Sequence, residues 1–441
     1  MPLPPQYRGA ADPSCDADWY SSPPSDTPSP RLRSPVRKID TRRFVRATRS
    51  TPREINRQIL LNLVRDLQPV SRADLARQLR IGRGMVTSLV DELLEEEAIY
   101  EGETVEAPRG RKPKMLFVRT RDRLVIAIDV RFSRTYMMLG DFAGNAVATE
   151  SFNTVVEPAA FIATIVARIE RLLHDHQASG RCEGIGLVVP GMVDQSNGRI
   201  LNAPQLGWRD VDVRDAIASA TGLTVQIENA PIACALAHTW LGQRGGEGGS
   251  DFAYITVSDG VGVGIVVNGQ VVRGHSHTAG EFGHIPLDMN GPKCLCGNRG
   301  CLEAHTSNLA TLSRYLGREL SAPDTRDLLR NSGLTIADVI SRARRDDPRA
   351  IHALDETARF LGHGIAMVIN ALNPAQVIVG GEITEAWDRL EPIIRAVIVE
   401  RALTTASALT PIIAEPAGIS PRLRGATALV AAPLFAAPQL A

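Results

Sequence analysis

The strongest constraint on this chain is a cluster of cysteines in its second half. Cys294, Cys296 and Cys301 fall within eight residues, and His284 lies ten positions before the first of them. Three thiolates and one imidazole form a closed tetrahedral zinc set, and the intervening glycines permit the tight turns that this spacing demands. A closed site leaves no position for water, so we predict a structural Zn²⁺. The alternative is that the cysteines are reduced and pack as small hydrophobic side chains.

Length and charge divide the chain. Its 441 residues exceed what one hydrophobic core usually holds, which indicates two or three domains. Residues 1–124 carry 23 basic and 17 acidic side chains, a net of +6, whereas residues 125–441 carry 26 and 32, a net of −6. A basic front joined to an acidic body suggests two functions on one chain. Without a long apolar run, a signal-peptide core or a disulfide framework, a cytoplasmic protein without a membrane partner is expected.

Residues 1–50 are predicted to form a disordered tail, because they are rich in Pro, Ser, Asp and Arg and lack apolar periodicity. One interpretation is a solvated extension. The other is a basic arm that contacts DNA phosphates, since four arginines lie just before the first predicted helix: Arg42, Arg43, Arg46 and Arg49.

Residues 51–120 are predicted to form a winged helix-turn-helix domain. The first helix is expected to end before Pro69 and to bury one apolar face: Ile55, Ile59, Leu60, Leu63, Val64 and Leu67. Ser71 to Asp74 resemble a capping box at the start of a second helix, and Gly82 separates it from a third. Two short strands, 98–100 and 115–118, would enclose a basic loop as the wing.

The third helix is predicted to read DNA. Its outward face carries short polar side chains beside a glycine, which lets a helix sit deep in a major groove. The predicted DNA contacts in the two helices and the wing are Arg72, Arg83, Gly84, Thr87, Ser88, Arg109, Arg111 and Lys112. A three-helix fold also occurs as a protein-interaction module, which is the alternative.

From residue 124 onward, strands and helices alternate, which predicts an α/β body of two lobes. Strands are expected at 124–130, 136–142, 146–153, 184–189, 224–228, 252–257, 261–267 and 376–379. Helices are expected at 158–177, 231–243, 350–371 and 386–402, with a terminal Ala-rich helix after Gly425. We assign residues 121–233 and 420–441 to lobe I, and residues 234–419, with the zinc site, to lobe II.

Several motifs of the body carry a family resemblance. They are Gly280 to His284, the cysteine cluster through Glu303, Val189 to Asp194, and Leu206 to Trp208. Together with the winged helix and the wing sequence Gly-Arg-Lys-Pro, they closely resemble the ROK family (repressor, open reading frame, kinase). The resemblance implies a two-lobed actin-like body, of the sugar kinase/ribonuclease H-like type, with a ligand cleft between its lobes.

The resemblance also implies a sugar site. In that family a sugar lies in the cleft, and the matching positions here are Asn229, Glu281, His284 and Glu303. Carboxylates, an amide and an imidazole can hydrogen-bond the hydroxyls of a sugar ring. His284 would give one ring nitrogen to zinc and the other to a sugar hydroxyl, so that the metal braces the pocket. The alternative is that both glutamates are carboxylates outside the sugar contacts.

The phosphate-handling motifs of ROK kinases are altered here. Asp129 to Ser133 replace the two glycines of the family's Asp-x-Gly-Gly-Thr with large residues, although Gly380-Gly381 is retained. Ala230 stands where the family has its catalytic Asp, and losing a general base costs about 10²–10⁴-fold in rate. Asp259 in the second phosphate loop would repel nucleotide phosphates. We therefore expect no catalytic residues and no kinase activity.

These features predict a sugar-responsive transcriptional repressor. It would bind operator DNA as a homodimer or homotetramer, and would be nucleoid-associated when bound. A sugar or sugar derivative in the cleft would change its affinity for DNA. One alternative is an active ATP-dependent sugar kinase with an appended DNA-binding domain. Another is a DNA-binding protein with an empty cleft whose body contacts a partner protein.

Overall fold

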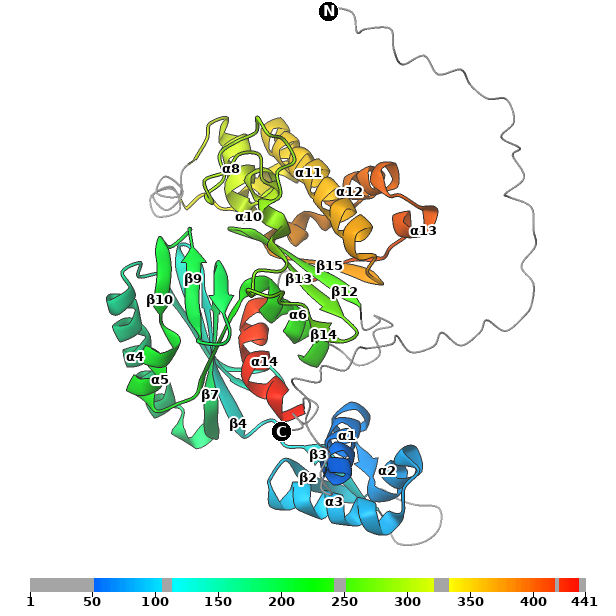
Figure 1. The fold of residues 1–441 in the computed structure, drawn as a ribbon. Coiled ribbons are helices and arrows are strands. Elements are labelled where there is room, and N and C mark those ends of the chain that lie inside the picture. Colours follow the sequence, from blue (N-terminus) through cyan, green and yellow to red (C-terminus); the bar gives the residue numbers. More distant parts are fainter. Residues whose placement is uncertain (1–50, 105–112, 242–250, 321–332, 417–419, 436–441) are drawn as a thin grey trace, which may run out of the picture. The chain divides into compact units, whose positions relative to one another are not determined.

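The computed structural model describes residues 51–104, 113–241, 251–320, 333–416 and 420–435 (Figure 1). The predicted tail 1–50 and the wing residues Arg109, Arg111 and Lys112 lie outside the described residues. The first elements are three helices and a three-stranded sheet of order β1-β3-β2. They are α1 (Thr51–Leu67), β1 (Val70–Ser71), α2 (Arg72–Leu79), α3 (Arg83–Glu95), β2 (Ile99–Thr104) and β3 (Lys114–Val118).

Local sequence signals set the bounds of these helices. Ser71 and Asp74 form the predicted capping box, in which each side chain bonds the other's backbone N–H, and Gly82 is the N-cap of α3. The predicted buried face of α1 is wrong in part. Ile55 and Ile59 are 36% and 43% exposed, whereas Leu61 is fully buried. At 100° per residue, the buried stripe is centred between Leu60 and Leu61, which puts the two isoleucines on the opposite side.

Lobe I is built on a five-stranded sheet of order β11-β7-β4-β5-β6, in which β4, β7 and β11 are parallel. Its strands are β4 (Arg123–Val130), β5 (Arg134–Asp141), β6 (Ala146–Asn153), β7 (Arg181–Val189) and β11 (Val225–Asn229). Helices α4 (Pro158–Asp175) and α5 (Arg214–Thr221) share a core with one face. Helices α6 (Ala230–Leu241) and α14 (Pro421–Phe435) cover the other (Figure 1). A small antiparallel sheet and one 3-10 turn complete the lobe: η1 (Gln177–Ser179), β8 (Met192–Asp194), β9 (Arg199–Ala203) and β10 (Trp208–Asp212).

Lobe II repeats the plan with a sheet of order β14-β13-β12-β15-β16. Its strands are β12 (Phe252–Val257), β13 (Val261–Val267), β14 (Gln270–Val271), β15 (Gln376–Gly380) and β16 (Ile412–Ala414). Its helices are η2 (Glu281–His284), α7 (Leu302–Thr306), α8 (Asn308–Leu316), α10 (Ile336–Ala343), α11 (Pro348–Leu372), η3 (Glu382–Ala386), α12 (Trp387–Arg401) and α13 (Thr405–Ala408). The largest apolar core among the described residues lies between this sheet and α10, α11 and α12.

The terminal helix begins earlier than predicted, at Pro421 rather than after Gly425. Gly425 lies inside α14 because of packing: a Cβ there would stand 2.6 Å from the carbonyl carbon of Ala233 on α6. Glycine therefore lets the two helices cross closely instead of ending one of them. Helix α6 also packs on β12 and β13, so residue 233, where we divided the lobes, falls within one continuous helix.

The parallel strands place polar side chains and loop segments at the carboxyl edge of each sheet. In lobe I, Asp129 and Glu228 both pair with Val188 on the intervening strand. In lobe II, Thr256 pairs with Gly380, so the segments that follow β12 and β15 leave the sheet side by side. Carboxyl edges of parallel strands are where α/β folds bind ligands. No helix among the described residues is both long and apolar enough to cross a membrane.

Candidate functional site

The predicted metal ligands come together in lobe II. His284 ends η2, Cys294 and Cys296 lie in the following loop, and Cys301 precedes α7; their ligand atoms all lie within 4.8 Å of one another. Tetrahedral zinc, with bonds of about 2.3 Å to sulfur and about 2.0 Å to nitrogen, separates two sulfurs by about 3.8 Å and a sulfur from a nitrogen by about 3.6 Å. The Sγ atoms of Cys296 and Cys301 are 3.8 Å apart, and Cys294 Sγ is 3.6 Å from His284 Nδ1. The cluster therefore has the dimensions of a metal site.

Glycine shapes the loop that carries these ligands. Gly300 has φ +66°, and a Cβ on it would lie 1.5 Å from the carbonyl oxygen of Asp288. Isolated bridges join Pro286 to Cys301 and Lys293 to Arg299, which folds the loop back on itself. This close backbone crossing brings Cys301 next to a histidine 17 positions earlier, since its thiol also lies 3.4 Å from the His284 carbonyl oxygen.

Three of the four predicted sugar contacts adjoin the metal cluster. His284 Nε2, the nitrogen that faces away from Cys294, lies 3.7 Å from Glu281 Oε2. Glu303 is 8% exposed; its carboxylate accepts the Val261 N–H at 2.9 Å and lies 3.6 Å from Cys294 Sγ. Burial raises the pKa of both glutamates. The geometry gives His284 one nitrogen for a metal and leaves the other beside a carboxylate.

The fourth predicted contact, Asn229, comes from lobe I, where it is the last residue of β11. It is buried, and its side-chain oxygen accepts the Ile232 N–H at 3.1 Å, which fixes the start of α6. Its neighbour Glu228 joins the lobes, because Arg273, from the loop before η2, bonds its carboxylate at 2.9 Å. His277 of the same loop lies 3.6 Å from Asp194. Sequence analysis missed both links, since each joins positions without a shared motif.

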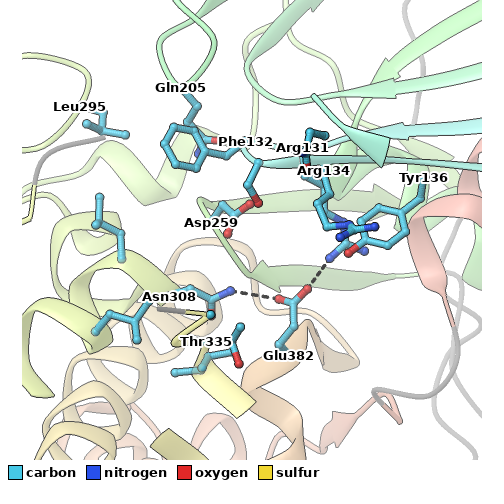
Figure 2. Close-up of a pocket in the computed structure, with 16 residues that line it drawn as sticks. Arg131, Phe132, Arg134, Tyr136, Gln205, Asp259, Leu295, Asn308, Thr335 and Glu382 are labelled. Atoms are coloured by element: carbon cyan, nitrogen blue, oxygen red, sulfur yellow. Dashed lines mark hydrogen bonds and ion pairs between the residues drawn. The ribbon is translucent and has the colours of Figure 1, made fainter. Parts of the chain in front are cut away.

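A pocket of about 580 Å³ lies between the lobes at the carboxyl edges of the strands (Figure 2). Its walls come from the β4–β5 turn, the start of α8, the start of α10, and η3. None of the four predicted sugar contacts is among its lining residues. It adjoins them at Gly260, where a Cβ would lie 2.6 Å from Gln205 Nε2 and 2.8 Å from Glu303 Oε2. Gln205 lines the pocket and was not predicted as a site residue.

Charged side chains fill the inner end of this pocket. Arg131 Nε bonds the buried Asp129 at 2.6 Å, and its other end pairs with Glu382 across the cleft. Burial opposes ionisation of Glu382, but Arg131 and Arg422 outweigh it and hold its pKa at about 2. Burial raises the pKa of Asp259, and the charge of Glu382 adds to this shift. Asp259, which we predicted to repel nucleotide phosphates, lines the same pocket as Arg131 and Glu382.

The predicted DNA-contacting residues differ in their exposure and in whether their side chains are already paired. Arg83, Gly84 and Thr87 are exposed on α3, but Ser88 is partly covered and accepts a hydrogen bond from Arg53 at 2.8 Å. Arg72 lies between two carboxylates, Asp91 at 2.7 Å and Glu101 at 3.0 Å. Met85 of the same helix, which sequence analysis did not single out, is 50% exposed. The free face of α3 is therefore formed by its first turns.

The two lobes, the cleft at the carboxyl edges and the Cys₃His cluster define an actin-like sugar-kinase fold. A family model described as "ROK family" matches residues 125–432, and the chain belongs to this family. Solved structures agree. A ROK family transcriptional regulator, a homolog of Escherichia coli MLC protein, matches with TM-score 0.71 and 27% identity over 87% of this chain and 97% of its own. A ROK glucokinase from Streptomyces griseus, in complex with glucose and AMPPNP, matches with TM-score 0.59 and 26% identity over 69% and 98%.

Curated relatives divide by how much of the chain they cover. The xylose repressor of Bacillus subtilis is 30% identical over 339 residues, 76% of this chain and 84% of its own length. The putative xylose repressor of a Caldicellulosiruptor species is 30% identical over 80% and 89%. A glucokinase of Halalkalibacterium halodurans is 33% identical but covers 61% of this chain and 83% of its own. The repressors thus match a longer part of this chain than the kinase does.

Proposed function

We propose that this chain is a sugar-responsive DNA-binding transcriptional repressor whose kinase-like body does not phosphorylate sugar. The observation that carries the proposal is the exposed face of α3, together with a body in which the family resemblance puts Ala230 at the position of the catalytic Asp. Ala230 begins α6, is 6% exposed and offers only a methyl group. A general base needs a titratable group within hydrogen-bond reach of the substrate hydroxyl. The length over which the repressor relatives match supports the same conclusion.

In this proposal residues 51–120 bind operator DNA and the two lobes bind the effector. We assign residues 121–233 with 420–441 to lobe I and 234–419 to lobe II, and α6 (Ala230–Leu241) crosses this boundary and packs on both sheets. Two copies of α3 must reach neighbouring half-sites, so the working form is a homodimer or a homotetramer. The proposed DNA contacts are those on the free face of α3 and in the wing, while Arg72 must exchange a carboxylate for a phosphate to take part.

The proposed effector is a sugar held by Asn229, Glu281, His284 and Glu303. Zn²⁺ on His284 and the three cysteines is structural: it would fix the imidazole so that Nε2 faces the ligand beside Glu281. Coupling requires that the sugar bind the DNA-competent and DNA-incompetent arrangements of the lobes with different affinity. The relatives named for xylose, glucose and N-acetylglucosamine supply the probes, which are these three sugars.

The test is fluorescence anisotropy with labelled DNA from the region upstream of the protein's own gene, against a scrambled duplex of equal length. We expect salt-sensitive binding that one of the three sugars weakens. Each phosphate contact contributes about 0.9 to the slope of log affinity against log salt. Equal affinity for the two duplexes at every salt concentration contradicts DNA recognition.

The kinase alternative is tested separately by ADP release with ATP, Mg²⁺ and each sugar. The matched control is Ala230→Asp, which restores the carboxylate. Turnover by the wild-type protein that depends on both sugar and ATP contradicts our assignment of Ala230.

A further inference from the structure

Glu382 holds an unusual position between the lobes. It is the first residue of η3, directly after Gly381, whose φ of +123° turns the chain out of β15 and into the cleft. Figure 2 shows its carboxylate between Asn308 on one side and Arg131 on the other. Asn308 Nδ2 donates to one oxygen at 3.1 Å, and Arg131 from lobe I pairs with the second. The Glu382 carboxylate is therefore contacted by one donor from each lobe.

Two guanidinium groups face three carboxylates at this end of the pocket. Arg131 and Arg422 are the two cations, and Asp129 and Glu382 are the two anions that they contact or approach: Arg422 Nη1 lies 3.6 Å from Asp129 Oδ1. Asp259 is the third carboxylate, and burial and the charges of Glu382 and Asp129 raise its pKa while those of Arg422 and Arg131 lower it. Removal of the Glu382 carboxylate would open the Arg131 guanidinium and the Asn308 amide to an external anion in a pocket of about 580 Å³, with Asp259 as the remaining carboxylate of the pocket wall.

We propose that the Glu382 carboxylate is a built-in anion. It fills a cradle of Arg131 and Asn308 that would otherwise accept an external oxyanion such as phosphate, and in doing so it latches lobe II to lobe I. The cleft then needs no nucleotide to hold its lobes together. Arg131 is 19% and Glu382 33% exposed, so this guanidinium–carboxylate pair is half-buried, and breaking it leaves each partner partly uncompensated.

Among the described residues, three ion pairs link the lobes, and two of them involve the same loop. Arg273 with Glu228, and His277 with Asp194, join the loop before η2 to lobe I. Arg131 with Glu382 joins η3 to the β4–β5 turn. A hinge motion of the lobes must stretch the Arg131–Glu382 pair, since Arg131 stays bonded to Asp129 in lobe I.

The first test is a gain of anion binding in the full chain. Thermal unfolding is followed with inorganic phosphate or pyrophosphate, at ionic strength matched with NaCl, for wild type, Glu382→Ala and Glu385→Ala. Glu385 is the matched control, because it is an exposed carboxylate of the same 3-10 helix. We expect phosphate to raise the melting temperature of Glu382→Ala only, and the double variant Arg131→Met/Glu382→Ala to lose the effect. An equal phosphate response of wild type and Glu382→Ala overturns the proposal.

The second test uses a variant that creates no cavity, so it applies even where Glu382→Ala does not fold. In Glu382→Gln the side chain keeps its size and loses its charge. We expect amide hydrogen exchange to accelerate roughly tenfold or more in residues 131–134 and 381–386, with lobe cores unchanged. Unchanged exchange in both segments contradicts the latch. Neither test uses a sugar or DNA, so failure here is independent of the proposed function.

Discussion

The metal cluster and the ion-paired group at the other end of the cleft both hold charged and polar side chains in the protein interior, but they do so in different ways. At one end four side chains have the spacing of an external ion, with sulfur–sulfur and sulfur–nitrogen distances of 3.8 and 3.6 Å. At the other end Arg131, Asp129 and Glu382 satisfy one another. A site built for an external partner must present several ligand atoms at fixed spacing, and it therefore leaves a motif. A site that is satisfied internally leaves none.

This difference predicts unequal consequences when one member is removed. The first end depends on an ion that the chain must acquire, whereas the second is complete once the chain folds.

The largest effect is expected at the metal cluster. Cys301→Ser removes one of four ligands from a site whose zinc affinity is about 10–16 kcal/mol in small peptides, so we expect zinc to fall from about one ion per chain to almost none and folding to be severely impaired. Metal content by mass spectrometry and thermal unfolding check this. Cys182→Ser is the control, because that thiol lies on β7, away from the cluster. A stable Cys301→Ser protein with stoichiometric zinc contradicts the ligand set.

The next effect is expected at the ion-paired end. Arg131→Met leaves the buried carboxylate of Asp129 and that of Glu382 without their shared partner, which should lower the free energy of unfolding by about 3–5 kcal/mol. Urea unfolding measures it. Arg134→Met is the control, since Arg134 is an exposed residue of the same hairpin whose side chain donates to the Ser151 hydroxyl, so its loss should cost less than about 0.5 kcal/mol. Similar losses in the two variants would show that the buried pairs do not stabilise the fold.

The same contrast explains how far the sequence predicted this molecule. Local patterns fixed many elements: the capping box of α2, and the strands β6, β12 and β13 with their predicted bounds. The Cys₃His cluster was predicted from spacing alone. Errors arose where tertiary packing decides. Apolar residues on both sides of α1 concealed its buried face, and Gly425 is a packing residue rather than a helix boundary.

The ion-paired end could not be predicted, because its partners are remote in sequence. Arg131 and Glu382 are 251 positions apart, and Arg273 and Glu228 are 45 apart. Sequence analysis recognised Arg131 and Asp259 only as departures from a phosphate-binding pattern. Long-range pairs of common charged residues carry no spacing signal, so only the fold shows which ones meet.

An intermediate effect is expected at the proposed sugar contacts. Glu281→Gln keeps the shape of the side chain but removes the charge that faces His284 Nε2, so affinity for the effector sugar should fall by roughly 10–100-fold, as for loss of one hydrogen bond to a charged group. Calorimetry with the sugar that weakens DNA binding measures it, and DNA affinity without sugar should be unchanged. Glu170→Gln, on the exposed side of α4, is the matched control. Wild-type sugar affinity in Glu281→Gln would remove this residue from the site.

The smallest effect is expected from Asp259, the carboxylate left over at the ion-paired end. Its raised pKa means that the folded state holds its proton more tightly than the unfolded state, so its contribution to stability falls as pH rises above the ordinary value of about 4. Asp259→Asn should therefore stabilise the protein at pH 7.5, by about 1 kcal/mol or less because the group borders a pocket that water can enter. The gain should shrink towards pH 4.5, where the carboxyl is protonated in a larger share of folded molecules. Urea unfolding of both proteins at the two pH values measures the difference directly. A destabilised variant, or a gain of equal size at both values, would show that Asp259 is a paired member of the cluster rather than its surplus charge.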